Sequence, residues 1–305
     1  MSKMEAELQN DSGSSALAVE TAVTSENYIY LIMKRFKKHK MAVAGVIFIC
    51  ILAVIAIFAP IIAPKSPYAV ENLFGAAPSS SHVLGTDQVG RDVLSRLVYG
   101  VRVSLIVGIG TMILSVSIGT ILGLISGYFG GKIDMIIMRI TDIFMSFPQM
   151  MLILIVVSIV GPGLKNIIWV LGFLGWPGVT RLVRGNVLSI KQMDYIKSAV
   201  VLGFNTPRLL FSHVLPNTMA PILVNATFGI ARAIIYEASL SFLGMGVQPP
   251  TASWGNMLTD AQALTVLTTK PWLWFPPGIM IIFTVLAFNF IGDGLRDAFD
   301  PRNTR

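Results

Sequence analysis

The chain of 305 residues is 54% hydrophobic and only 13% charged, with a formal net charge of +7. A water-soluble domain carries about 25% charged residues. The composition therefore excludes an ordinary soluble domain and indicates an all-α integral membrane protein with several spans.

The chain begins with two cytoplasmic segments. Residues 1–26 are rich in Ser, Glu, Ala and Asn and lack an apolar run, so we expect a disordered cytoplasmic tail and no signal peptide. Residues 27–40 join aromatic and apolar side chains to a basic run that ends at Lys40. Such a segment suits the headgroup region and predicts an interfacial elbow helix. A plain stop signal that only fixes topology explains it equally well.

Six apolar stretches are long enough, or nearly so, to cross a bilayer as helices. They cover residues 41–63, 103–126, 141–161, 166–183, 218–241 and 275–293. The distribution of Lys and Arg favours a cytoplasmic location for both termini, an N-in, C-in topology. The chain then divides further into an external segment (64–102), a transmembrane core (103–293) and a cytoplasmic tail (294–305).

Two external segments are long. From Gly90 onward, the first predicts an amphipathic helix with Val93 and Leu97 on its apolar face. The second, near 246–274, contains Trp254 and two further tryptophans. Tryptophan prefers the membrane interface, so we expect this segment to dip toward the bilayer.

Small residues recur every fourth position in the second span, at Ser115, Gly119, Gly123 and Gly127. A row of this kind lets another helix approach backbone to backbone. It predicts a close helix contact inside the membrane bundle.

No enzyme motif is present. Gly130-Gly131-Lys132 is followed by Ile133, where a P-loop needs Ser or Thr. The three histidines are far apart, and Cys50 is the only cysteine. We expect no catalytic residue, no metal site and no cofactor held by this chain.

Two ionisable residues, Arg232 and Glu237, lie in the fifth span. A spacing of five places them about 140° apart on a helix, which makes them poor partners for an ion relay. We expect them to line a transport pathway or to contact another subunit.

The loop at 194–216 is polar enough to leave the membrane on the cytoplasmic side. We expect a short helix from Asp194, a left-handed Gly203 at its end, and a second helix capped by Asn205 or Thr206. Pro216 is expected to close that helix. The loop therefore predicts a helical hairpin that docks a soluble partner.

This loop resembles the EAA loop of binding-protein-dependent ABC importer permeases, in which a triplet, a glycine and a final Leu-Pro keep fixed spacings. The matching positions are Lys197, Ser198, Ala199, Gly203, His213, Leu215 and Pro216. Lys197 replaces the family's Glu and His213 its Ile, so an ion pair made by that Glu does not carry over.

Other signatures narrow the resemblance to the C-type subunit of dipeptide and oligopeptide (peptide/nickel) permeases. One lies in the first external segment: Gly85, Thr86, Asp87, Gly90, Arg91 and Asp92. Its functional interpretation is contact with a binding protein or partner permease, and turn and cap chemistry is the alternative. Two more are Glu237 to Gly246 and Gly292 to Asp297.

The resemblance implies a type I ABC importer permease with six spans in a bacterial or archaeal plasma membrane. Its implied partners are a homologous second permease, two ATPase subunits that bind ATP and Mg²⁺, an external solute-binding protein and membrane lipid, with no nucleic acid. It implies transport of di- or oligopeptides. A nickel or other solute importer of the same architecture and a stand-alone secondary transporter remain the alternatives.

Overall fold

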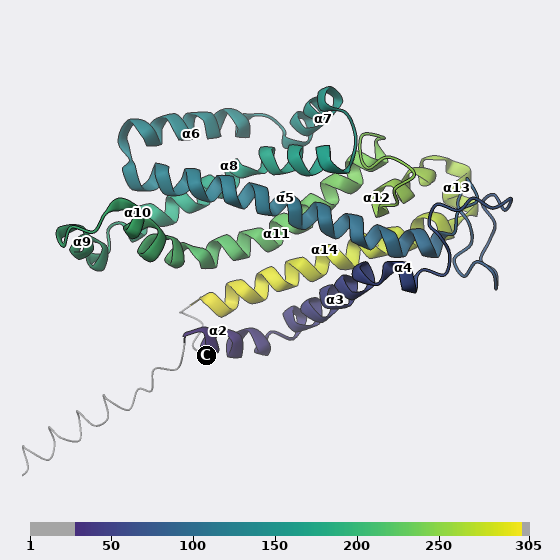
Figure 1. Cartoon of the computed structure of the whole chain (residues 1–305), viewed down its shortest axis with the longest axis horizontal. Coiled ribbons are helices and arrows are strands. Elements are labelled where there is room, and N and C mark those ends of the chain that lie inside the picture. The colour runs from purple at the N-terminus through teal and green to yellow at the C-terminus, as the bar shows by residue number, and fades with distance from the viewer. Residues whose placement is uncertain (1–27, 301–305) are drawn as a thin grey trace, which may run out of the picture.

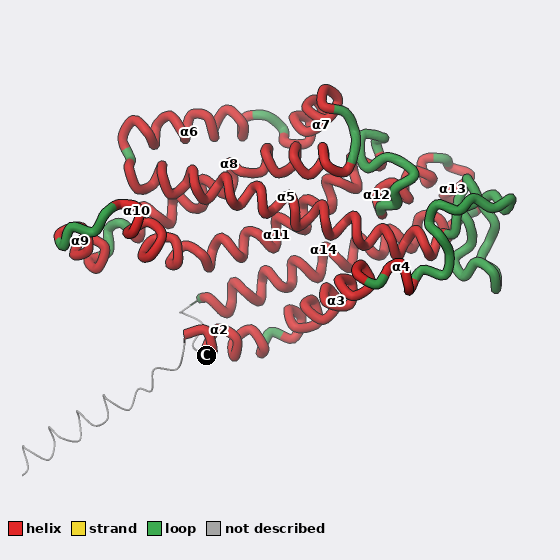
Figure 2. The backbone as a smooth tube through the Cα atoms, viewed as in Figure 1, coloured by secondary structure: helices red, strands yellow, loops and turns green. Residues whose placement is uncertain are grey.

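The computed structural model describes residues 28–300, and this part of the chain is built from helices without a named strand. The long helices lie lengthwise in an elongated bundle (Figures 1 and 2). One end carries α2 (Tyr28–Lys38), α9 (Asp194–Val201) and α10 (Thr206–Leu209). The other end carries the long loops and three short helices, which are α4 (Ala59–Ile62), α12 (Trp254–Met257) and α13 (Leu264–Thr269). The predicted disordered tail lies outside the described residues.

Within residues 28–300, five helical segments are long and apolar enough to cross a membrane. They are α3 (Lys40–Ile57), α5 (Val93–Phe129), α8 (Leu164–Ile190), the segment Thr206–Phe242, which ends in α11 (Leu215–Phe242), and α14 (Pro271–Phe299). A sixth span arises if α6 (Gly131–Ser146) and α7 (Gln149–Val160), bent by 89° at their junction, count as one. The all-helical class is confirmed, with five to six candidate spans.

Helix α5 is continuous across the boundary that we expected between an external helix and the second span. Asp92 caps it, accepting a hydrogen bond from the Ser95 backbone N–H at 2.8 Å. Nothing interrupts the helix near residue 102, so the amphipathic stretch is simply its first part. Its 37 residues span about 56 Å, which exceeds a hydrocarbon core of about 30 Å.

The two described ends of the chain lie together. The Arg35 guanidinium donates a hydrogen bond to the Asp300 carbonyl at 3.1 Å, and Gly294 lies against Phe36 and Ala42. Helix α14 continues to Phe299, into the segment expected to be a tail. The neighbouring ends agree with the predicted N-in, C-in topology.

The row of small residues on α5 packs against α8, as predicted. A Cβ atom added at Gly119, Gly123 or Gly127 would lie within 2.8 Å of the Cβ of a valine on α8. These valines, Val179, Val183 and Val187, also recur every four residues. The two helices therefore meet backbone to backbone along this row.

Trp254 is a core residue and does not anchor the second external segment at the bilayer surface. Its side chain is fully buried, and its indole N–H donates to the Leu97 carbonyl at 3.2 Å. Gly100 on α5 leaves room for the ring. The segment, built from α12 (Trp254–Met257), η2 (Leu258–Gln262) and α13 (Leu264–Thr269), packs onto the start of α5 through this ring.

Candidate functional site

The loop after α8 forms the predicted hairpin, which projects from the end of the bundle (Figure 1). Helix α9 (Asp194–Val201) ends at Gly203, whose φ is +78°. The N–H groups of Gly203 and Phe204 donate to the carbonyls of Val200 and Ala199, which is the pattern of a Schellman cap. Asn205 then caps α10 (Thr206–Leu209) by accepting from the Arg208 N–H.

The root of the hairpin is fixed to the bundle. Ile196 and Ala199 on α9 and Leu209 on α10 are buried in one apolar cluster with Val183 and Val187 of α8. Because protein interiors are close-packed, such a root moves as a unit with the helices it touches. A displacement of the hairpin would therefore be passed to α8 and α11.

The tip of the hairpin is apolar and exposed. Val201 is 87% exposed and Leu202 is 75% exposed, and Val200 and Phe211 add further apolar surface. Exposed apolar side chains that lie together mark a surface for contact with a protein or a membrane. We call the surface formed by the consecutive residues Val200, Val201 and Leu202 the apolar tip.

The second helix of the hairpin does not close at Pro216, contrary to our expectation. A π-helical turn, η1 (Leu210–Val214), carries it directly into α11. Pro216 lacks the N–H that would otherwise continue the ladder of helix hydrogen bonds, and the π turn lies directly before it, where the regular α-helical pattern is interrupted. The Asn217 side chain donates to the His213 carbonyl at 2.7 Å. The hairpin and the span after it are therefore one mechanical element.

The residues that match the EAA pattern have different surroundings. Ala199 is buried, and the His213 ring lies 5.7 Å from that of Phe204. Lys197 and Ser198 are exposed, and Lys197 pairs with Asp194 at 3.3 Å. Leu215 is half-buried beside the cluster, and Pro216 is exposed. Lys197 therefore faces away from the bundle.

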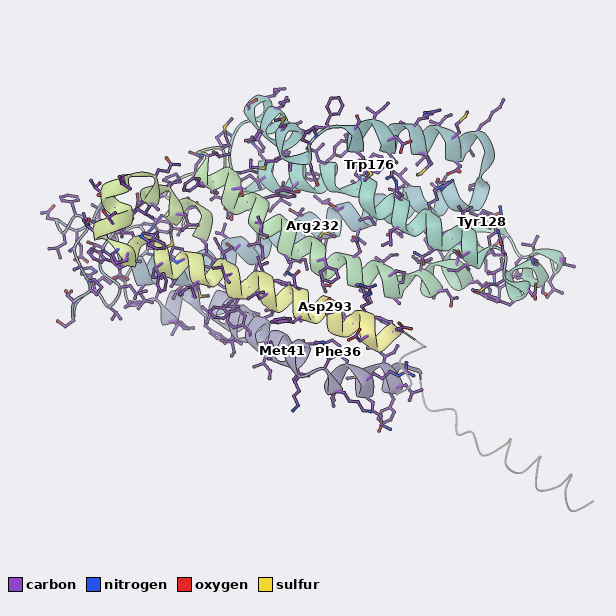
Figure 3. All side chains as sticks on the ribbon, turned by 180° about the vertical axis from the view of Figure 1, so that it is seen from behind. Phe36, Met41, Tyr128, Trp176, Arg232 and Asp293 are labelled. Atoms are coloured by element: carbon purple, nitrogen blue, oxygen red, sulfur yellow. The ribbon has the colours of Figure 1, made fainter. Side chains whose placement is uncertain are left out.

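A cavity of about 300 Å³ lies among α5, α6, α7, α8 and α11. Arg232 lines it midway along α11 (Figure 3), together with Gln149, Tyr236 and Asn225. The bend between α6 and α7 opens onto this space through Phe147 and Gln149. Broken helices of this kind commonly border solute pathways in transporters.

Glu237, by contrast, is enclosed by its own chain. Its side chain is fully buried and accepts a hydrogen bond from the Ser241 hydroxyl at 2.7 Å. It does not line the central cavity. The structure therefore gives no support to a pathway or subunit contact for Glu237, and only Arg232 occupies such a position.

An ion pair ties the first turn of α6 to α8. The Arg184 guanidinium donates two hydrogen bonds to the Asp134 carboxylate, each 2.6 Å long, and the Ser126 hydroxyl donates to the same carboxylate. We expect Arg184→Gln and Asp134→Asn each to lower stability. In a double-mutant cycle, their coupling should be about 1 kcal/mol because the pair is bidentate and partly buried.

Denaturant unfolding in mixed micelles measures this coupling. The exposed pair of Arg181 and Asp142, 2.7 Å apart, is the matched control and should couple more weakly. Equal coupling energies in the two cycles would show that the Arg184–Asp134 pair contributes no more to stability than an exposed ion pair.

The six residues of the external motif build a compact turn. Gly85 and Gly90 have positive φ angles of +73° and +89°. Thr86 pairs with Asp92 in an isolated β-bridge, and the Arg91 guanidinium donates to the Asp87 carboxylate at 2.7 Å. These side chains contact their own chain, as turn and cap chemistry requires.

Sequence reasoning missed several residues around the central cavity. Gln149, Asn225 and Tyr236 line it, and Phe147 stands at the break between α6 and α7. The signal was available in Pro148, because the residue before a proline is biased away from the helical conformation. The predicted single span over 141–161 does not include the break that this proline indicates.

The apolar spans, the projecting hairpin and the central cavity define a multi-span membrane transport protein. Residues 119–305 match the family described as binding-protein-dependent transport system inner membrane component. Residues 27–78 match the N-terminal transmembrane domain of oligopeptide transport permease C. The chain belongs to this family of importer permeases and is a multi-pass inner membrane component.

Several curated relatives are similar in sequence to this chain over most of its length. The dipeptide transport system permease protein DppC of Alkalihalophilus pseudofirmus is 44% identical over 271 residues, covering 88% of each chain. The oligopeptide permease OppC of Bacillus subtilis is 42% identical, also over 88% of each chain. The glutathione permease GsiD of Pectobacterium atrosepticum is 43% identical, over 88% of this chain and 89% of the relative.

A solved structure shares the fold. The methionine ABC transporter MetNI, in an inward-facing form, aligns with a TM-score of 0.55 at 20% identity. The alignment covers 67% of this chain and 97% of that chain. The fold is therefore that of an ABC importer permease.

Proposed function

We propose that this chain forms half of the translocation pathway of an ATP-driven importer for di- or oligopeptides. A homologous second permease supplies the other half, and an external solute-binding protein delivers the peptide. Two ATPase subunits bind ATP and Mg²⁺, and one of them docks at the hairpin 194–216. The hairpin carries the proposal because it joins a buried root to the exposed apolar tip.

The mechanism follows from rigid coupling. When ATP draws the two ATPase subunits together, a docked hairpin moves with its subunit. Its root contacts α8 and continues into α11, so both helices shift and alter the space around Arg232. Movements of packed elements as rigid bodies are a common basis of such switching. No catalytic residue in this chain is needed.

Peptides are the solutes that the relatives support. The three curated relatives are described as permeases for a dipeptide, an oligopeptide and glutathione, which are all peptides. Their agreement favours a peptide over a nickel complex as the transported solute. The uptake experiment therefore compares a dipeptide with nickel.

The test is uptake into proteoliposomes that contain both permeases and both ATPases, with the binding protein added outside. Labelled dipeptide should accumulate only with internal ATP and the binding protein present. Accumulation of nickel instead would refute the peptide assignment. Uptake by this chain alone, without ATPases, would refute the importer itself.

Arg232 is proposed to line the pathway and to contact the peptide carboxylate. Replacing it by Gln should lower dipeptide uptake about tenfold, because a charge-assisted hydrogen bond contributes about 1.5–3 kcal/mol. ATP hydrolysis should persist. Arg139, an exposed arginine on α6 outside the cavity, is the matched control. Unchanged uptake by the Arg232→Gln variant would place Arg232 off the pathway.

A further inference from the structure

The loop segment between α4 and α5 lies at the end of the bundle opposite the hairpin (Figure 1). It contains His82, whose side chain is only 2% exposed. Within residues 28–300, the charged side chains that contact the His82 ring are Lys65, Glu71 and Asp92. Lys65 follows α4 and Asp92 caps α5, so the ring joins the two ends of the segment.

One ring nitrogen of His82 donates to Asp92. Its Nδ1 atom lies 2.9 Å from Oδ1 of the Asp92 carboxylate. The other carboxylate oxygen, Oδ2, accepts from the backbone N–H and the hydroxyl of Ser95, at 2.8 and 2.7 Å. An ionised carboxylate can only accept hydrogen bonds, and such a group is stabilising at a helix N-terminus. The Nδ1 atom therefore carries a hydrogen.

The other ring nitrogen, Nε2, has two neighbours with opposite requirements. The Lys65 ammonium group lies 3.1 Å away and can only donate. Oε2 of Glu71 also lies 3.1 Å away. A hydrogen bond of 2.7 Å from Lys65 holds the pKa of Glu71 below its usual value, so this carboxylate only accepts. A neutral ring therefore accepts from Lys65, whereas a protonated ring donates to Glu71.

Protonation of the ring also balances the charges of the cluster. With a neutral ring, the carboxylates of Glu71 and Asp92 exceed the Lys65 ammonium by one charge. A proton on Nε2 brings the sum to zero, and an uncompensated charge beside a buried group is costly. The protonated ring is then bonded to both carboxylates at once.

We propose that His82 is a pH-dependent latch for the segment 65–92. A protonated ring binds Glu71 and Asp92 together and holds the segment against the start of α5, and loss of the Nε2 proton releases Glu71. The Glu71 backbone N–H donates to the Gly90 carbonyl at 3.0 Å, so this release also loosens the external motif. In the predicted topology this end of the bundle faces outward, so the latch responds to the pH of the external medium.

The test is hydrogen–deuterium exchange of the full-length chain in nanodiscs at about pH 6 and about pH 8, corrected for the intrinsic pH dependence of amide exchange. Histidine is the side chain that ordinarily titrates in this window, whereas carboxylates and lysines titrate outside it. Protection of the amides in 65–92 should be about fivefold greater at the lower pH, the upper range for a partly exposed ion pair. Protection of α8 should not change.

Glu71→Gln keeps the size of the side chain and removes its charge, so the two pH values should then give equal protection of the segment. Asp142→Asn, which alters an exposed carboxylate on α6, is the matched control and should keep the wild-type difference. His82→Gln should also abolish the difference. Because Glu71 is 39% exposed, its variant decides the matter if the buried His82 variant does not fold.

Three results would overturn the latch. The first is equal protection of the wild-type segment at both pH values, and the second is a difference that survives Glu71→Gln. The third is a difference of the same size in α8, which would show a change of the whole bundle and not of the segment 65–92.

Discussion

Replacing Gly123 by valine should separate α5 from α8 and sharply reduce the amount of folded protein. A Cβ atom at this position would lie 2.6 Å from the Val183 Cβ and 2.8 Å from the Thr180 carbonyl oxygen. One of these atoms is backbone and cannot rotate away. Overpacking typically costs about 1–3 kcal/mol, and we expect the upper end or beyond because valine adds two methyl groups to the clash.

The measurement is the thermal stability of the purified chain in detergent, followed by size-exclusion chromatography. Gly185→Val is the matched control because a Cβ atom there, on the neighbouring helix, would meet nothing within 4 Å. Both variants place a β-branched residue in a helix, so only the clash differs. Equal loss in the two variants would show that the row on α5 does not set the helix distance.

Replacing Gly203 by valine should uncouple the hairpin from ATP hydrolysis. Its φ of +78° lies in the left-handed region, which a β-branched residue strongly disfavours. A Cβ atom at 203 would meet nothing within 4 Å, so the effect arises from the backbone and not from a clash. The valine variant should lose most of the ATPase activity that the binding protein stimulates in the reconstituted complex.

Asparagine tolerates the left-handed conformation, so Gly203→Asn is the matched control. It should retain most of the stimulated activity. If valine and asparagine have the same effect, the Schellman cap is not what holds the hairpin in its coupling geometry.

The hairpin was predictable because its signals are local. Gly203 and Asn205 act on the backbone within a few residues, and the structure places both as expected. The row at Gly123 was also predictable, since a four-residue period places its members on one face of a helix. In each case the signal is a residue type or a spacing within a few residues of the sequence, so it can be read without knowing the tertiary contacts.

Other features depend on contacts between distant segments. Glu237 was expected to line a pathway or to contact another subunit, but the loop at 246–257 folds over α11 and buries it. The sequence predicted that Trp254 lies at the membrane interface. In the structure its ring packs against Gly100 on another helix, a contact between residues far apart in the sequence. The break at Pro148 and the π-helical turn before Pro216 had proline signals, but the sequence did not specify how the helices would bend or continue.

The central claim is that the apolar tip docks an ATPase subunit. Its most direct test is maleimide labelling of a Leu202→Cys variant in a Cys50→Ser background, since Cys50 is the only native cysteine. A Val83→Cys variant in the exposed external segment is the control. We predict that bound ATPase subunits protect position 202 and leave position 83 reactive. Equal labelling of position 202 with and without the ATPase subunits would contradict the account.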